Sequence, residues 1–237
     1  MELTPRLQRI AELVPHGAVA ADIGTDHGYL PIYLVLQGIS PRALACDVRP
    51  GPLDKARANV REYGLEGKIS CRLSDGFEEV TERDADTAVM AGMGGRLCAE
   101  LLLREMRREK NILPALKALL LQPQSDVAAV RRTVHRAGFF IAQETMTVDR
   151  GKRYTVLLCR PGHETYADEL DYQYGKLLRE KRDPILYAEL LERRGVIDQI
   201  RSRLGEGESA GSAACAKRRR ELDLEEQGIE EVLRRWE

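Results

Sequence analysis

Aspartates that follow short apolar segments are the residues of this sequence best suited to chemistry. Asp22 and Asp26 both lie in the segment Asp22–Gly28, Asp47 comes 25 residues after Asp22, and Asp75 closes the third such segment. A carboxylate can accept hydrogen bonds from ribose hydroxyls or from the amino group of a base, and it attracts a cation. The pattern therefore predicts a site for a nucleoside ligand that carries positive charge.

The first loop separates two classes of nucleoside cofactor. A dinucleotide site uses the pattern G-x-G-x-x-G, because its pyrophosphate binds bare backbone amides and is repelled by a carboxylate. Gly24 and Gly28 leave the backbone accessible here, but two carboxylates stand beside them. Those carboxylates suit the ammonium and sulfonium groups of S-adenosyl-L-methionine. In this interpretation Asp22 helps to position the amino-acid end of the cofactor, Asp47 binds the ribose hydroxyls and Asp75 accepts from the adenine amino group.

Further residues of the predicted cofactor site come from the ends of the same segments. Residues 91–95 are rich in glycine, so their backbone can pass close to a flat ligand. A single aspartate at a strand end is otherwise a turn or cap residue, and the prediction depends on several occurring together. The complete set is Asp22, Gly24, Asp26, His27, Gly28, Asp47, Val48, Asp75, Gly76, Gly92, Met93 and Gly94.

Alternating strands and helices must position these residues. Apolar runs with little polar alternation are typical of strands buried on both faces of a sheet. Strands are expected at 18–24, 42–48, 69–75, 87–93, 118–122, 139–148 and 154–159. Helices are expected near the N-terminus and at 29–36, 52–63, 96–109 and 126–137, the last with Ser125 as its N-cap. The order predicts an α/β fold with a doubly wound, Rossmann-like sheet of seven strands, whose last strand is antiparallel and joined to the sixth by 149–153.

The last part of the chain has a different pattern. Charged residues occupy 44 of the first 164 positions but 31 of the final 73, a density typical of solvated helices. Apolar residues recur there at helical spacing, as in Leu186, Leu190 and Ile197, and Gly205–Ala214 is predicted to be a turn or mobile loop. We therefore expect two domains, 1–162 and 163–237, the second a coiled-coil-like set of helices. Its basic turn at 217–220 favours nucleic acid binding, with oligomerisation as an equal alternative.

Composition excludes several classes of protein. No apolar run approaches the roughly 18 residues of a membrane span, and the N-terminus lacks the apolar block of a signal peptide. We expect a cytoplasmic protein with no membrane partner. The five cysteines form no close pair and no metal-ligand spacing, and they are expected to be structural. His16, His135 and His163 have no ligand partners at useful spacing, so no metal is predicted.

Five ordered blocks of the sequence, within roughly residues 1–160, share a pattern with a known family: 20–31, 72–76, 91–95, 121–124 and 147–154. These blocks resemble the bacterial tRNA adenine-N1 methyltransferases of the TrmK type. The resemblance implies a class I methyltransferase fold, S-adenosyl-L-methionine as cofactor, and methyl transfer to N1 of adenine 22 in the tRNA D-loop. The helical tail matches the family's coiled-coil C-terminal domain in placement. Two positions depart from the family pattern: Gln124 replaces an expected Asn, and Cys46–Val48 replaces Gly-Glu-Val.

The implied reaction suggests catalytic residues. Adenine N1 has a lone pair, so its attack needs positioning more than a strong base. The product ring is cationic, and a carboxylate nearby would stabilise that charge or accept a proton from N6. Asp26 is the candidate, with His27 as a second; alternatively, Asp26 caps or anchors the next helix and His27 is structural. The target base must be unpaired or flipped out, and Tyr29 could stack on it or simply pack.

A tRNA substrate also requires contacts between its phosphates and basic side chains. Basic runs are otherwise ordinary solvated faces of helices. The predicted tRNA contacts are Tyr29, Arg104, Arg107, Arg108, Lys152, Arg153, Lys217 and Arg218, with Lys110, Arg131, Arg132 and Arg136 as further candidates. The chain is expected to be a monomer or a weak homodimer.

Three other functions stay open at this point. A methyltransferase acting on a small molecule would use the same cofactor loops. An oxidoreductase using a nicotinamide cofactor is disfavoured by the carboxylates of the first loop. A non-catalytic RNA-binding or assembly protein would depend on the helical tail. Methyl transfer that requires tRNA and does not occur on free nucleosides would distinguish these functions.

Overall fold

The computed structural model of the protein describes residues 1–204 and 212–236. The chain separates into two compact units, Met1–Ala167 (unit 1) and Asp168–Glu237 (unit 2). This division falls five residues beyond the boundary predicted between 162 and 163, and the assignment of a function to each segment stays a prediction. Most of the loop predicted over Gly205–Ala214 lies outside the described residues. No helix within the described ranges is long and apolar enough to cross a membrane.

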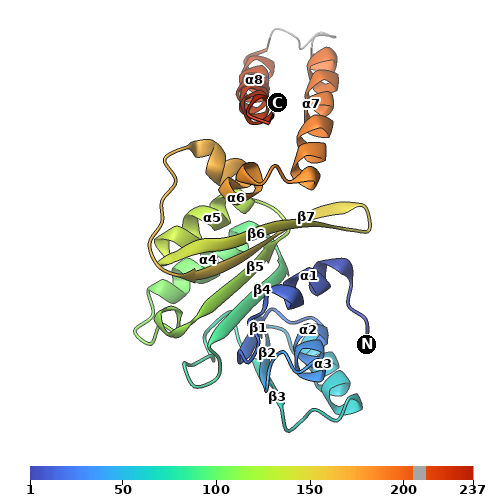
Figure 1. The fold of residues 1–237 in the computed structure, drawn as a ribbon, viewed down its shortest axis with the longest axis vertical. Helices are drawn as coiled ribbons and strands as arrows, with labels where there is room; N and C mark the ends of the chain where they lie inside the picture. The colour runs from blue at the N-terminus through green and yellow to red at the C-terminus, as the bar shows by residue number, and fades with distance from the viewer. Residues whose placement is uncertain (205–211, 237) are drawn as a thin grey trace. The chain divides into compact units, whose positions relative to one another are not determined.

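Unit 1 is built on one sheet of seven strands. Their bounds are β1 Ala20–Ile23, β2 Ala43–Asp47, β3 Ile69–Leu73, β4 Thr87–Met93, β5 Ala118–Pro123, β6 Phe139–Asp149 and β7 Lys152–Pro161. The strand order is β3-β2-β1-β4-β5-β7-β6, and β7 alone runs opposite to the other six strands (Figure 1). The predicted doubly wound sheet with an antiparallel last strand is confirmed. Its order reverses between β1 and β4, the position at which open sheets of this kind bind ligands.

Helices cover both faces of this sheet. Their bounds are α1 Pro5–Leu13, α2 Tyr29–Leu36, α3 Pro50–Glu62, α4 Gly95–Met106 and α5 Val127–Arg136. Apolar residues of α1 and α2, such as Ile10 and Leu34, pack with Val89 of β4 and Leu120 of β5 in one core cluster. In Figure 1, α1, α2 and α3 lie on one side of the sheet and α4 and α5 on the other. The central strands β1, β2 and β5 are buried along their whole length, which explains their continuous apolar sequence.

Two predicted helix boundaries are wrong for local reasons. The N-cap of α5 is Asp126, which has a φ of 50°, and not Ser125. The Ser125 hydroxyl instead donates to the Asp126 carboxylate at 2.9 Å. Helix α4 ends at Met106 and not at residue 109, and the amides of Arg107 and Arg108 donate to the carbonyl oxygens of Arg104 and Glu105, three residues back, as in a tightened last turn.

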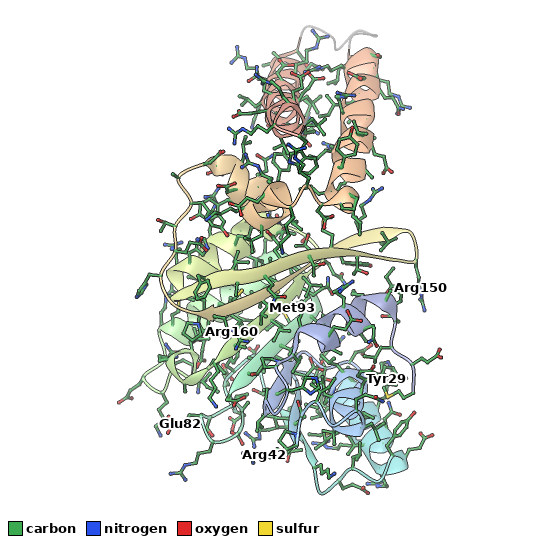
Figure 2. The ribbon with its side chains drawn as sticks, in the orientation of Figure 1. Tyr29, Arg42, Glu82, Met93, Arg150 and Arg160 are labelled. Carbon is green, nitrogen blue, oxygen red and sulfur yellow. The ribbon has the colours of Figure 1, made fainter. Side chains whose placement is uncertain are left out.

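Strands β6 and β7 form a hairpin with a shorter loop than the predicted 149–153. Asp149 pairs with Lys152, so only Arg150 and Gly151 connect the strands. Both have positive φ, of 50° and 75°, as the tight turns of hairpins require. Arg150 lies at the tip of the hairpin (Figure 2), next to the basic Lys152 and Arg153.

Unit 2 contains the helices α7, Pro184–Leu204, and α8, Ala213–Arg234, preceded by a π-helical turn at Asp171–Gly175 and the short helix α6, Lys176–Glu180. The predicted apolar seams are buried, as Leu190 and Ile197 of α7 and Ile229 of α8 show. Arg193 of α7 also binds Glu225 of α8 through two hydrogen bonds of 2.5 and 2.8 Å. Apolar contacts and ion pairs therefore hold α7 and α8 together.

A buried ion pair joins α5 to β6. Arg131 Nε donates to Glu144 Oε1 at 2.7 Å, and both residues are 2% exposed. Arg131 was a further candidate for tRNA contact, but its guanidinium is buried inside unit 1, so that assignment is wrong. The spacing of the basic residues in 131–136 did not reveal this buried ion pair, because the carboxylate of Glu144 lies on another element.

We expect Arg131→Met to destabilise unit 1 by about 3–5 kcal/mol, because it leaves the Glu144 carboxylate buried without its guanidinium partner. Thermal unfolding followed by circular dichroism measures the loss. The double variant Arg131→Met/Glu144→Leu is the control and should recover most of it, since replacing both partners removes the buried charge. A loss of less than about 1 kcal/mol in the single variant would contradict this reading of the pair.

Candidate functional site

A cleft of about 810 Å³ opens where the strand order of the sheet reverses. The loops after β1, β2, β3 and β4 and the start of α1 line it. All but one of the residues predicted for the cofactor site line this cleft: Asp22, Gly24, Asp26, His27, Gly28, Asp47, Val48, Asp75, Gly76, Gly92 and Met93. Gly94 lies outside the lining as the N-cap residue of α4. The structure thus brings together side chains from four separate strand ends.

The loop after β1 is shaped by two glycines with left-handed backbone. Gly24 has a φ of 82°, and a Cβ there would lie 2.8 Å from the Met93 Cε. The amides of Gly24 and Thr25 both donate to the carbonyl oxygen of Cys46, at 2.8 and 2.7 Å. Gly28 has a φ of 70° and is the N-cap of α2. A side chain at either glycine would strain the backbone, so the loop keeps its open course beside the cleft.

Asp22 is the most perturbed acidic residue of the cleft. It is 8% exposed, at the end of the fully buried strand β1. Burial raises the pKa of Asp22 from 3.8 to about 6, and the negative charge of the nearby Asp47 adds to the rise. Thr25 and the positive charge of Arg6 both lower this pKa. Since that pKa is still below 7, the carboxylate is largely ionised at neutral pH although it is buried. Such a group is stabilised by a positively charged ligand.

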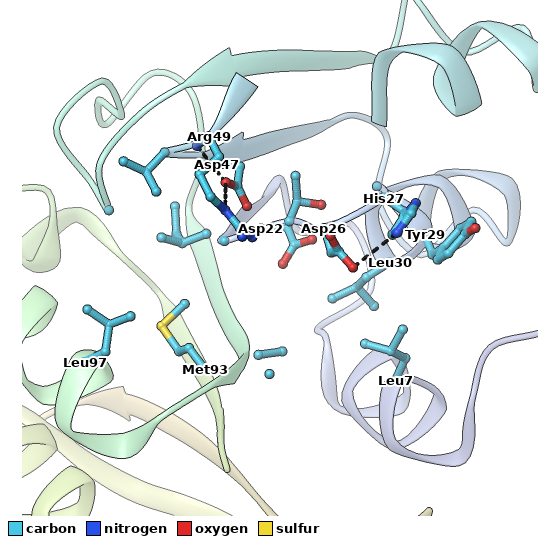
Figure 3. Close-up of a pocket in the computed structure, with 18 of the residues that line it drawn as sticks. Leu7, Asp22, Asp26, His27, Tyr29, Leu30, Asp47, Arg49, Met93 and Leu97 are labelled. Carbon is cyan, nitrogen blue, oxygen red and sulfur yellow. Dashed lines mark hydrogen bonds and ion pairs between the residues drawn. The ribbon is translucent and has the colours of Figure 1, made fainter. Parts of the chain in front are cut away.

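Asp47 and Asp75 are held by different partners. The buried Asp47 accepts from the backbone amide of Arg49 through Oδ1 at 2.8 Å, which orients its carboxylate at the end of β2 (Figure 3). Asp75 Oδ2 accepts from Arg104 Nη1 at 2.8 Å, and this hydrogen bond lowers the pKa of Asp75. Arg104 also donates to the Asp75 carbonyl oxygen at 2.8 Å. Arg104 is thus tied to a residue of the cleft, and its predicted contact with tRNA stays a prediction.

Asp26, His27 and Tyr29 form one group at the mouth of the cleft. His27 Nε2 lies 3.2 Å from Asp26 Oδ2, and the ring of His27 stacks on that of Tyr29 at 5.3 Å (Figure 3). The Asp26 side chain is 70% exposed, and the N-cap of α2 is Gly28. Asp26 therefore does not cap that helix. The alternative that it anchors the helix stays open, and its catalytic role stays a prediction. Its carboxylate is accessible to a ligand in the cleft.

Sequence reasoning missed Arg6 and Gln122. Arg6 reaches the cleft from α1, and its Nη1 donates to Gln122 Oε1 at 2.6 Å. The same oxygen accepts from the amide of Gly92 at 3.2 Å, so α1, β4 and β5 meet at this point. The Arg6 guanidinium also lies 5.7 Å from the ring centroid of Tyr154. The available signal was Arg6 itself, a basic residue on the first turn of a helix whose other residues pack against the core. Its partner, Gln122, lies 116 positions away in the sequence and could not be predicted.

The other residues predicted to contact tRNA lie outside the cleft. Arg107 and Lys152 are exposed, whereas Arg108 is bound to Glu105 and to backbone carbonyls. Lys217 and Arg218 are exposed on α8 of unit 2, where Arg218 pairs with Glu221 at 2.9 Å. Arg153 lies in β7 opposite Val148. Contact of these residues with tRNA stays a prediction.

Cysteine and metal chemistry find no support in the described part of the chain. All five cysteines are free, and burial raises the pKa of the Cys46 and Cys98 thiols to about 12, so neither is a thiolate near neutral pH. Within residues 1–204 and 212–236, no group of three or more His, Cys, Asp or Glu side chains could hold a metal ion.

Comparison with known proteins gives consistent matches. Residues 3–157 match a family model described as a methyltransferase domain. The tRNA (adenine(22)-N(1))-methyltransferase of Bacillus subtilis (strain 168) is 36% identical over 179 residues, which is 75% of this chain and 74% of that protein. The crystal structure of the B. subtilis m1A22 tRNA methyltransferase TrmK has a TM-score of 0.84 at 28% identity and covers 98% of both chains. Streptococcus pneumoniae Sp1610, in complex with S-adenosyl-L-methionine, has a TM-score of 0.82 at 30% identity over 96% of this chain and 98% of that one.

We expect Asp22→Asn to stabilise unit 1, with a pH dependence that identifies the cause. The raised pKa means that the folded state binds the proton of Asp22 more tightly than the unfolded state. The contribution of protonated Asp22 to the free energy of unfolding is therefore fully present below pH 4 and is lost as the pH rises through about 6. The advantage of the variant should grow from nearly zero at pH 4 to about 3 kcal/mol at pH 7, measured by urea unfolding. An advantage that is the same at every pH would contradict an origin in ionisation.

Proposed function

Since this chain belongs to the family of bacterial tRNA (adenine(22)-N1)-methyltransferases of the TrmK type, we propose that it transfers a methyl group from S-adenosyl-L-methionine to N1 of adenine 22 in the D-loop of tRNA. The observation that carries this proposal is the cleft at the switch point of the sheet. Carboxylates from three strand ends and bare glycine backbone meet there, and the loop after β1 contains no Lys or Arg. That combination suits a cationic nucleoside and not a pyrophosphate.

The residues of the cleft fit S-adenosyl-L-methionine. Asp22 is buried and takes part in none of the ion pairs formed by the described residues, so a cationic ligand would offset the cost of its burial. Its carboxylate would face the ammonium group of the cofactor, and Asp47, oriented by the Arg49 amide, would accept from the ribose hydroxyls. Arg104 occupies Oδ2 of Asp75, so the adenine amino group would bind Oδ1. A cleft of about 810 Å³ has the size of a site for a ligand of this kind.

Asp26, His27 and Tyr29 would assist the reaction. When bound, the cofactor supplies the methyl group on a positively charged sulfur, and the sulfur–carbon bond breaks as the bond to adenine N1 forms. The adenine ring then carries positive charge, which the exposed Asp26 carboxylate would stabilise, or relieve by accepting a proton from N6. His27, 3.2 Å from Asp26, would hold that carboxylate in place or share the proton. Tyr29 is 45% exposed beside them and offers a face on which the unpaired target base could stack.

Binding of tRNA would extend beyond the cleft. The exposed Arg107 after α4, the β6–β7 hairpin with Arg150, Lys152 and Arg153, and the basic turn of α8 supply cations for phosphate groups. The chain would act as a monomer or a weak homodimer. Because the proposed substrate is tRNA, we place the protein in the cytoplasm.

Mass spectrometry of tRNA after incubation with the protein and methyl-labelled cofactor tests the proposed function. We expect one methyl group on adenine 22 of an unmodified tRNA transcript and none on free adenosine. The matched control is the same tRNA with guanine at position 22, which should stay unmethylated because its N1 carries a proton and no lone pair. Label at another position, or equal label on free adenosine, would contradict the proposal and favour a different tRNA site or a small-molecule substrate.

We expect Asp26→Asn to lower kcat for tRNA methylation by about 10- to 100-fold, because the amide cannot stabilise the cationic ring or accept its proton. The dissociation constant of S-adenosyl-L-methionine, measured by calorimetry, should change little. Asp54→Asn is the control, since Asp54 is a similarly exposed aspartate on α3 that pairs with Arg57 outside the cleft. Loss of cofactor binding in Asp26→Asn would reassign Asp26 from the reaction to binding, and an unchanged kcat would refute its catalytic role.

A further inference from the structure

Unit 2 contains a cleft of its own, of about 350 Å³, that the proposed reaction does not use. Tyr187, Leu191 and Arg194 line it from one face of α7, at helical spacing. Leu233 and Trp236 line it from the end of α8. The cleft therefore has an apolar floor, two aromatic side chains and a basic side chain, all within a single compact unit.

The two aromatic side chains of this cleft lie next to each other and are partly accessible. The rings of Tyr187 and Trp236 lie 5.9 Å apart at an angle of 31°. Trp236 Nε1 donates to the carbonyl oxygen of Arg179 at 2.9 Å, which holds the indole in one orientation. Tyr187 is 45% exposed. Large apolar rings normally gain by burial, so an exposed ring beside a tethered indole offers a preformed stacking surface.

The charge of this cleft is opposite to that of its surroundings. Residues 165–237 carry 14 basic and 17 acidic side chains, yet the residues lining the cleft include two arginines, Arg182 and Arg194, and no carboxylate. Other arginines of the unit, such as Arg193 and Arg201, are paired with glutamates of α8. Among the described residues of unit 2, Arg182 and Arg194 take part in no ion pair; Arg182 donates only to the Arg235 carbonyl oxygen, at 3.3 Å.

We propose that the cleft of unit 2 binds an unpaired nucleotide of the tRNA, with its base on Tyr187 and Trp236 and its phosphates on Arg182 and Arg194. Flat aromatic faces stack on bases of any sequence, and free arginines bind phosphate oxygens. The nucleotide must be unpaired, because a base inside a helix has no free face. This inference rests on the proposed function and adds a second contact with the same substrate.

A protein partner explains the cleft less well. A stable protein interface buries about 800 Å² on each partner, and such interfaces combine apolar contacts with paired charges. The cleft is small, and its two arginines meet no acidic residue within the described part of its own lining. A single base with its phosphate fits both the size and the charge.

The only tryptophan of the chain, Trp236, reports directly on the proposed contact. We expect its fluorescence to be quenched when tRNA is titrated into the full-length protein, because a base would stack on the indole. Saturating S-adenosyl-L-methionine alone should leave the emission unchanged, since its proposed site lies in unit 1. Quenching should fall with rising salt in parallel with tRNA binding, which is measured separately by the anisotropy of labelled tRNA.

Substitutions in the cleft then test the contribution to affinity. Tyr187→Ala and Arg194→Ala should each raise the dissociation constant of tRNA by about fivefold or more, and leave the dissociation constant of S-adenosyl-L-methionine unchanged. Arg203→Ala removes the same charge from the exposed end of α7, and Tyr63→Ala removes a tyrosine of similar exposure from unit 1. Both controls should bind tRNA like the wild type.

Four results would overturn the inference. Tight tRNA binding with no quenching would refute the contact, and so would unchanged tRNA affinity in both cleft variants. If the wild type still methylates tRNA, either result leaves the proposed function intact. Altered self-association of Tyr187→Ala in sedimentation, with unchanged tRNA affinity, would assign the cleft to a protein interface. A wild-type protein that neither binds nor methylates tRNA would refute the proposed function itself, together with the contact that rests on it.

Discussion

A carboxylate that stays ionised while buried raises the free energy of the folded state, and unit 1 is organised around such a group at Asp22. β1 lies in the middle of the sheet, between β2 and β4, and is buried along its length, so Asp22 within it is only 8% exposed. The chain then leaves the sheet at Gly24, where two successive amides donate to the Cys46 carbonyl oxygen and not to the carboxylate. The carboxylate is left with room for a cation in front of it. Its burial is thus a disadvantage for folding that becomes useful when a positively charged ligand binds.

The walls around Asp22 depend on contacts between elements that are distant in sequence. Gly92 has a φ of 80°, and a Cβ there would lie 3.0 Å from Arg6 Nη1, so this glycine admits the guanidinium to the cleft. Arg6 in turn holds the buried Gln122 side chain, which also accepts from the Gly92 amide. The first helix is therefore part of the site as well as part of the core, because the residue beside its packing face places a positive charge near Asp22 and weakens the rise of its pKa. Burial outweighs this effect, so the pKa of Asp22 is still raised, to about 6.

Properties encoded locally could be predicted from the sequence, and properties that arise across the fold could not. Apolar segments located all seven strands, and β1, β2 and β5 lack polar alternation because they are buried along their whole length. The edge strands β3 and β6 are only partly buried. The carboxyl ends of parallel strands then had to meet, which brought Asp22, Asp47 and Asp75 to one cleft. The pairing of Arg104 with Asp75, of Arg131 with Glu144 and of Arg6 with Gln122 joins side chains that are not neighbours in sequence, and no periodicity predicts such pairs. The N-cap of α5 was missed for another reason: Ser125 has the right side chain, but its hydroxyl binds the next residue while Asp126 adopts the left-handed backbone.

The net charge of the chain is close to zero partly because it includes the carboxylates of the candidate site. A net charge of −1 over 237 residues suggests no affinity for nucleic acid. In the folded protein, however, Asp22, Asp47 and Asp75 face a cleft suited to a cation, and the carboxylates of Glu144 and Glu225 are bound to arginines of the same unit. Acidic side chains used in this way contribute little to the field that a phosphate meets at the surface, because each is shielded by burial or by its partner. Affinity for tRNA then depends on the local groups of arginine and lysine that folding leaves unpaired, and their positions carry more information than the total charge.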